Sequence, residues 1–247
     1  RMLWHKDNFL KGEPFPYVRQ TNVHWVVTDA FPNGGDLSRR FPPEAGLSAS
    51  YTFDGKEYGT RRVTVKAPAE LPTLIMAYKG PTLRDVEKDI DPYALEMLNA
   101  ILDGHDAARF NKKLVREDKV ALSVDIGYDG TTRGPGMIYM SGTPAEGRTI
   151  ADLEAALRAE IARVQKDGVS EAELKRAKAQ LIASQVYKLD SMFGQAMEIG
   201  QIESVGISYK KLDRMLEKLQ QVTAADVQAA ARTWFNDDTL TVGVLDP

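Results

Sequence analysis

Residues 120–143, VALSVDIGYDGTTRGPGMIYMSGT, decide the fold of this chain. Two stretches typical of strands, 120–128 and 136–143, flank the segment Asp129–Pro135, which is rich in aspartate, glycine and proline. These residue types favour turns because glycine accepts unusual backbone angles and proline fixes its own φ. The pattern therefore predicts a hairpin of two consecutive strands.

Further strands are predicted on both sides of this hairpin. Arg62–Lys66 alternates polar and apolar residues, as a half-buried strand does. Leu74–Tyr78 is a continuous apolar run, which suits a strand at the centre of a sheet. Residues 239–245 alternate again and are expected to form the last strand.

Helices are predicted between and after these strands. Asp91 stands before Pro92, which places a capping carboxylate ahead of a proline at the first helical position, and Gly104 ends that helix. A second helix is expected over 106–116. Three later helix starts have the spacing of a capping box or its aspartate variant, namely Thr149 with Asp152, Ser170 with Glu173, and Thr223 with Asp226.

The order of these elements is strands, helices, a hairpin, a run of helices and a last strand. Such segregation is typical of an α+β fold, with a mostly antiparallel sheet and helices packed on one face. We assign residues 61–247 to this domain. Residues 1–60 are predicted to be an irregular N-terminal arm or linker, broken by prolines and glycines, with short strands at 23–27 and 47–53.

Composition and charge exclude several classes of function. The net charge of −3 gives no sign of the basic face of a nucleic-acid-binding protein, so no nucleic-acid partner is predicted. Cysteine is absent, which excludes disulfides, thiolate nucleophiles and cysteine-bound metal sites. No apolar run approaches the ~20 residues that a membrane-spanning helix needs, so no membrane span is predicted.

The start of the chain leaves the cellular compartment open. It begins at Arg1 rather than at a methionine and has no signal peptide. We therefore expect a piece of a longer protein, with any targeting segment upstream of it. A periplasmic or secreted location and a cytoplasmic one are all compatible with the sequence of the parent protein.

The residues of this chain assemble no active site that the sequence can identify. Its histidines are His5, His24 and His105, and none has a second histidine at helical spacing, so neither HExxH nor HxxEH is present. A GxSxG motif and a phosphate-binding loop are missing as well. His105 and Asp106 could form an acid/base pair, but we favour the interpretation that His105 lies in a surface turn at a helix end. We predict no catalytic residue and no metal ligand in this chain.

Four segments of the sequence resemble parts of pitrilysin/insulinase-family metallopeptidases. DGHDAARFNKKLVRE is similar to the region where a Gly–small–small–Arg helix leads to a Leu-x-Arg-Glu element and a strand. The others resemble a glycine-and-proline turn and two helix starts of that family. The four segments are 103–117, 128–136, 167–178 and 222–231. They occur in the family's order, so the resemblance covers 61–247.

The resemblance implies a processing-peptidase-like architecture and a role beside a zinc enzyme. In this family two halves or two subunits close around a chamber, and one of them carries HxxEH and binds zinc. This chain lacks the motif and so resembles the C-terminal, zinc-free half. The expected partners are an N-terminal catalytic half or subunit, which would hold the zinc, and a peptide substrate. We expect this chain to hold no cofactor of its own and to show no peptidase activity by itself. Alternatives are a scaffold of the same fold that has lost catalysis, or an unrelated α+β binding protein.

The same resemblance implies three substrate-binding candidates. In active relatives an arginine at the position of Arg116, with a tyrosine seven residues on, reaches the substrate or the tetrahedral intermediate and stabilises its charge. Here Ser123 stands at the tyrosine position. Tyr128 could substitute, but alternation along a regular strand directs it to the opposite face from Ser123. A structural alternative for Arg116 is bonding to helix-end carbonyls or pairing with the neighbours of Glu117.

Two further groups of residues are candidates for a binding surface. Met137, Tyr139 and the 131–136 turn are expected to form a wall of the chamber, since the second half complements a peptide held by the catalytic half. Met192, Phe193 and Met197 resemble a binding stripe, but core packing is favoured for them.

Overall fold

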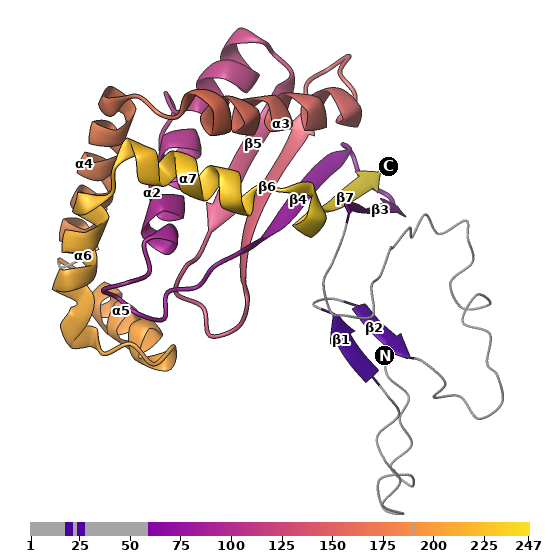
Figure 1. Ribbon diagram of the computed structural model, residues 1–247. Helices are drawn as coiled ribbons and strands as arrows, with labels where there is room; N and C mark the ends of the chain where they lie inside the picture. The colour runs from indigo at the N-terminus through magenta and orange to yellow at the C-terminus, as the bar shows by residue number, and fades with distance from the viewer. Residues whose placement is uncertain (1–17, 22–23, 28–58, 189) are drawn as a thin grey trace, which may run out of the picture.

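The computed structural model describes residues 18–21, 24–27, 59–188 and 190–247 (Figure 1). A five-stranded sheet forms the centre of the longer part, in the order β3-β7-β4-β6-β5. Its strands are β3 (Arg61–Lys66), β4 (Thr73–Gly80), β5 (Ala121–Tyr128), β6 (Gly136–Pro144) and β7 (Thr241–Asp246).

The sheet is antiparallel except at one pair. The C-terminal strand β7 inserts between β3 and β4 and runs parallel to β3, while all other neighbours are antiparallel. Strand β4 lies in the middle, as the apolar run 74–78 predicts, with Met76 opposite Met140 of β6. The predicted hairpin corresponds to β5 and β6.

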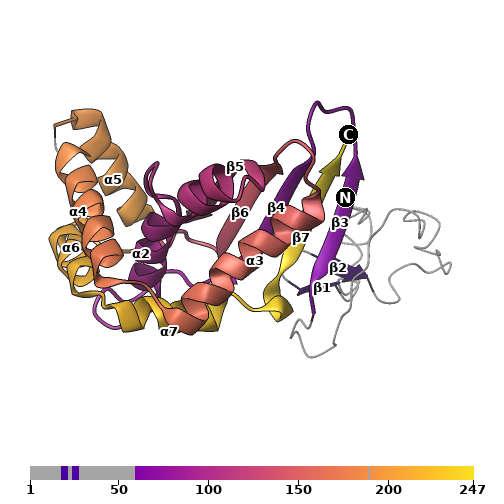
Figure 2. The same cartoon turned by 90° about the horizontal axis from the view of Figure 1, so that it is seen from above.

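Helices cover one face of this sheet (Figures 1 and 2). Helix α2 packs on β5, α3 packs on β4 and β6, and α7 packs on β4. The α-helices are α2 (Asp91–Asp103), α3 (Ile150–Asp167), α4 (Glu171–Lys188), α5 (Met192–Ser204), α6 (Leu212–Gln221) and α7 (Ala224–Trp234). Shorter helical segments are η3 (Asn111–Glu117), η4 (Tyr209–Lys211) and η5 (Asp237–Thr239). The predicted α+β fold is confirmed.

The core lies between this helical layer and the sheet. Alternate residues of the strands, including Leu74, Met76 and Met140, are fully buried, because their side chains point toward the helices. The helices contribute matching apolar stripes. Their fully buried residues include Leu95, Leu98, Leu153, Leu157, Val227 and Ala230.

All three predicted capping boxes are present. The side chains of Thr149 and Thr223 accept from the backbone N–H groups three residues on, at 3.1 and 3.2 Å. Ser170 does the same at 3.3 Å. In each case the acidic side chain at the third position accepts in return from the N–H of the capping residue. Each cap contributes about 1 kcal/mol to helix stability.

The predicted capping role of Asp91 is wrong. The residue before helix α2 that caps it is Ile90, and no side chain bonds the first turn. Asp91 instead accepts a hydrogen bond of 2.8 Å from the indole Nε1 of Trp234 on α7. A partly buried indole N–H needs an acceptor, and α7 packs beside α2, so the carboxylate serves the tertiary contact rather than the helix end.

The helix predicted over 106–116 is shorter and of a different type. Helical geometry begins only at Arg109 and continues as the π-helix η3, in which the N–H of Asp118 donates to the carbonyl of Lys113 five residues earlier. The preceding residues form a turn, because Nδ1 of His105 accepts from the N–H of Ala107 at 3.0 Å. The expected surface turn at His105 is therefore confirmed.

The N-terminal segment is described only in part. Strands β1 (Val18–Thr21) and β2 (His24–Val27) pair antiparallel, and β2 matches the strand predicted over 23–27. The strand predicted over 47–53 lies outside the described residues. A search of the described helices for one long and apolar enough to cross a membrane finds none.

Candidate functional site

The face of the sheet opposite the helices displays exposed apolar side chains. Ile75, Met137 and Tyr139 are 48%, 53% and 42% exposed, although their neighbours along β4 and β6 are fully buried. Val65 of β3 is 52% exposed on the same sheet. We call the surface formed by Val65, Ile75, Asp125, Met137 and Tyr139 the open face. Exposed apolar side chains gathered on one surface are a feature of binding sites.

Tyr139 lies across strand β5 on this face. Its register partner is Gly127, and a Cβ atom at Gly127 would lie only 2.2 Å from the ring atom Cζ of Tyr139. The missing side chain therefore makes room for the aromatic ring to lie flat on the sheet. Beside it, Ser141 donates a hydrogen bond of 2.9 Å to Asp125. The open face thus combines an aromatic ring, aliphatic groups and a carboxylate.

Arg116 lies exposed in η3. Neither a hydrogen bond nor an ion pair joins its side chain to any residue within the described ranges. The acids that follow it are held by Lys113, whose Nζ lies 3.3 Å from Glu117 and 3.0 Å from Asp118. Among the described residues, Arg116 makes neither contact of the structural alternative: it bonds no helix-end carbonyl and pairs with no neighbour of Glu117.

Ser123 and Tyr128 lie on opposite faces of the edge strand β5. Ser123 is exposed opposite Thr143, next to an irregularity in the pairing of β5 with β6. Tyr128 faces the helices, where its hydroxyl donates to the carbonyl of Pro81 at 2.9 Å and burial raises its pKa. The separation that strand alternation predicts is therefore present, and the phenol of Tyr128 lies away from the open face.

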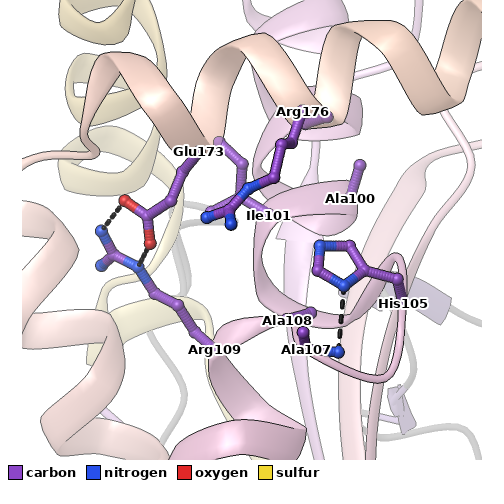
Figure 3. A pocket seen from close by; sticks show the side chains of 9 residues that line it. Ala100, Ile101, His105, Ala107, Ala108, Arg109, Glu173 and Arg176 are labelled. Carbon is purple, nitrogen blue, oxygen red and sulfur yellow. Dashed lines mark hydrogen bonds and ion pairs between the residues drawn. The ribbon is translucent and has the colours of Figure 1, made fainter.

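Two of the family-like segments meet at an ion pair that sequence reasoning missed (Figure 3). Arg109 donates from Nε and Nη2 to the two carboxylate oxygens of Glu173, at 2.6 and 2.8 Å. Nη2 also donates to the carbonyl of Gly168 at 3.3 Å. The Arg109 guanidinium, which donates to the carboxylate, lowers the pKa of Glu173 to about 2. The sequence did single out both segments, 103–117 and 167–178, through their family resemblance. It contained no sign that Arg109 of the first would contact Glu173 of the second.

This ion pair has a structural role. It joins Arg109, where the helical geometry that leads into η3 begins, to the first turn of α4, across 64 residues of sequence. Figure 3 shows Arg176 and His105 next to it, around a cavity of only about 20 Å³, which is about the size of a water molecule. So small a space holds no substrate. The described residues include no group of three or more histidine, aspartate or glutamate side chains placed to hold a metal ion.

The core packing favoured for Met192, Phe193 and Met197 is wrong. These side chains are 90%, 76% and 58% exposed on α5. Ile202 is the buried residue of helix α5, and the other described side chains of this helix are exposed or partly buried. The helix lies at one end of the helical layer, beside α4 (Figure 2).

The comparisons with known proteins assign the family. The model of the family described as "Peptidase M16 inactive domain" matches residues 36–181. The chain belongs to this family. It is thus the inactive domain of a zinc-protease family, and the resemblance to the zinc-free half of a pitrilysin/insulinase-family metallopeptidase is confirmed.

Relatives of this inactive domain agree in sequence and in fold. A Bacillus subtilis (strain 168) protein named "Uncharacterized zinc protease YmxG" is 28% identical over 213 residues, which are 86% of this chain and 50% of that protein. A protease from Helicobacter pylori has the same fold, with a TM-score of 0.71 and 19% identity over 78% of this chain and 45% of that one. The peptidase M16 inactive domain from Pseudomonas fluorescens gives 0.66 and 18%, over 82% and 46%. The chain therefore spans about half the length of these relatives.

Proposed function

We propose that this inactive domain lines the substrate chamber of a zinc metalloendopeptidase and positions a peptide for a zinc site in an N-terminal half or a partner subunit. The observation that carries the proposal is the open face. It presents Ile75, Met137 and Tyr139 to solvent on the opposite side of the sheet from the buried side chains of Leu74, Met76 and Met140. The proposal is supported by the relatives' length, since this chain spans only about half of them and they have room for a second half.

The chemistry of the open face suits a peptide. A flat sheet surface with an aromatic ring, a methionine and an isoleucine contacts apolar side chains of many shapes, since methionine adapts its conformation readily. Asp125 adds an acceptor and a negative charge among them. Such a wall favours an extended peptide with apolar side chains without demanding one sequence, which fits a chamber that holds substrates rather than cuts them.

Arg116 is the residue of this domain that we propose to assist the reaction. Its exposed guanidinium, which pairs with none of the described residues, would offer strong donors to a peptide carbonyl or to the oxyanion that forms at the zinc site of the other half. Ser123 lies on the exposed side of β5 and contributes at most a short hydroxyl. Tyr128 is assigned a packing role, since its hydroxyl is bound to Pro81.

A catalytically dead scaffold of the same fold is the second candidate. The observation that favours it is Ser123, which stands where the family resemblance expects a tyrosine that reaches the substrate. A scaffold would keep the open face as a docking surface for a partner protein without any reaction taking place there. The two proposals differ in whether the assembled protein, with zinc bound in its other half, cleaves peptides.

The test uses the domain together with its zinc-binding half, from the same reading frame or a neighbouring gene. Tyr139→Ala removes the largest contact of the open face, and we expect KM for a fluorogenic peptide to rise by about tenfold, because a lost aromatic contact costs about 1–2 kcal/mol. Tyr187→Ala is the matched control, since Tyr187 is 72% exposed on α4. Equal kinetics of the two variants contradict the chamber role. An assembly that binds peptides but never cleaves them supports the scaffold.

A further inference from the structure

A cavity of about 550 Å³ lies on the helix-covered side of the molecule. Its walls come from α2, the end of α4, α5, α6 and the connection between β5 and β6, and these helices group at one end of the domain (Figures 1 and 2). We call it the α5 cavity. Its volume falls within the ~300–1,000 Å³ that is usual for small-molecule sites.

The α5 cavity has a mainly apolar lining with a carboxylate in it. Glu96 of α2 lines the cavity and makes no hydrogen bond or ion pair with another described residue. Burial raises its pKa, and the nearby Lys188 ammonium opposes that rise. A buried carboxylate that accepts no hydrogen bond is costly, and none of the described residues, Lys188 included, donates one directly to Glu96. The apolar lining includes Pro92, Tyr93, Met197, Ile202, Met215 and Leu216.

The other polar groups of the cavity already have partners or share the sign of Glu96. Lys188 pairs with Glu198 of α5 at 3.3 Å. Gln201 donates to the hydroxyl of Thr131 at 3.1 Å, which fastens α5 to the β5–β6 connection. The charged side chains that line the cavity are Glu96, Asp129, Glu198, Asp213 and Lys188. Four acids against one base favour a cationic ligand over an anionic or neutral one.

We propose that the α5 cavity binds a small organic amine, with its ammonium group on the Glu96 carboxylate and its apolar body against Tyr93, Met215 and Leu216. The ammonium supplies the donors that Glu96 lacks and neutralises its charge where water is scarce. The aliphatic and aromatic wall excludes water from the body of the ligand. This site is separate from the open face and does not rest on the proposed chamber role.

The test is calorimetric titration of the full 247-residue chain with 2-phenylethylamine, and with the neutral 2-phenylethanol as its matched ligand. We expect the amine to bind at least about tenfold more tightly near neutral pH, as a charge-assisted hydrogen bond provides. Glu96→Gln keeps the shape and removes the charge, and it should abolish this preference. Glu171→Gln, at an exposed position of α4 outside the cavity, should retain it.

A second variant tests the cavity itself. Met215→Trp leaves Glu96 in place but fills the space, and it should abolish binding of both the amine and the alcohol. Thermal unfolding of both cavity variants checks that they fold, and removing an unpaired carboxylate should leave the melting temperature unchanged or higher. The proposal is overturned if the amine fails to bind at millimolar concentration, if amine and alcohol bind equally, or if the amine binds the Glu96→Gln variant as well as the original chain.

Discussion

Replacing Glu173 with glutamine tests how strongly the two family-like segments depend on their ion pair. Glutamine keeps the size of the side chain and an acceptor oxygen for the N–H of Ser170, so the capping box survives. It removes the negative charge that Arg109 contacts through two hydrogen bonds. The substitution therefore isolates the charge of the pair from the helix cap.

The size of the effect follows from the pKa of Glu173, which the Arg109 guanidinium lowers from 4.5 to about 2. At about 1.4 kcal/mol per pKa unit, this lowering sets a ceiling of about 3 kcal/mol, part of which belongs to the Ser170 hydrogen bonds that the variant keeps. Both side chains are 21% exposed, so solvent screens the pair. We therefore expect a loss of about 1–2 kcal/mol, which lowers the melting temperature by roughly 2–8 °C.

The stabilisation also has a defined dependence on pH. A carboxyl group whose pKa is lower in the folded state stabilises the fold at pH values above its unfolded pKa of 4.5. The contribution is lost as the pH falls from about 4.5 toward 2. The free energy of unfolding of the original chain, measured by urea denaturation from pH 7 downward, should therefore approach that of Glu173→Gln in this window.

Glu171→Gln is the matched control for this measurement. Both glutamates lie in the first turn of α4, so each loses the same favourable interaction with the helix dipole, about 0.3–1 kcal/mol. Only Glu173 contacts Arg109. If the two variants unfold at free energies within about 0.5 kcal/mol of each other, or if the difference between Glu173→Gln and the original chain is independent of pH, the role assigned to the ion pair is wrong.

Two further predictions concern the proposed chamber. Arg116→Ala in the assembled peptidase should lower kcat by about 100-fold with little change in KM, because an oxyanion donor acts in the transition state. Arg116→Lys should recover part of this loss of kcat. Steady-state kinetics in which Arg116→Ala leaves kcat unchanged would contradict the role assigned to Arg116. Gly127→Ala places a methyl group against the ring of Tyr139, which is 42% exposed and can swing away. Urea denaturation of Gly127→Ala should show a free energy of unfolding lower by less than about 1 kcal/mol. KM for a peptide should rise, as is expected for Tyr139→Ala. An unchanged KM would show that the flat position of the Tyr139 ring does not matter for peptide binding.

Much of the fold could be predicted because its signals are local. A capping box needs a serine or threonine and an acid three residues apart, so Thr149, Ser170 and Thr223 identify helix starts from the sequence alone. Strand alternation likewise placed Ser123 and Tyr128 on opposite faces. These patterns depend on backbone geometry within a few residues, which no distant contact needs to complete.

The candidate site was predictable only in part. Met137 and Tyr139 were expected to form a wall, and both are exposed on the open face. The space that Gly127 leaves for the ring of Tyr139 depends on the register between β5 and β6, and local sequence patterns do not specify that register. Met192 and Phe193 were assigned to the core because apolar residues are usually buried, but burial depends on whether another element packs there.

The sequence by itself determined that this chain lacks the zinc motif, and it determined where most helices and strands begin, since both follow from residue types at short spacing. Tertiary structure alone decided that β7 inserts between β3 and β4, that Asp91 bonds Trp234 rather than a helix end, and that Arg109 meets Glu173 across 64 residues. These contacts join segments far apart in the chain, so they exist only after the core has packed and fixed which side chains face one another.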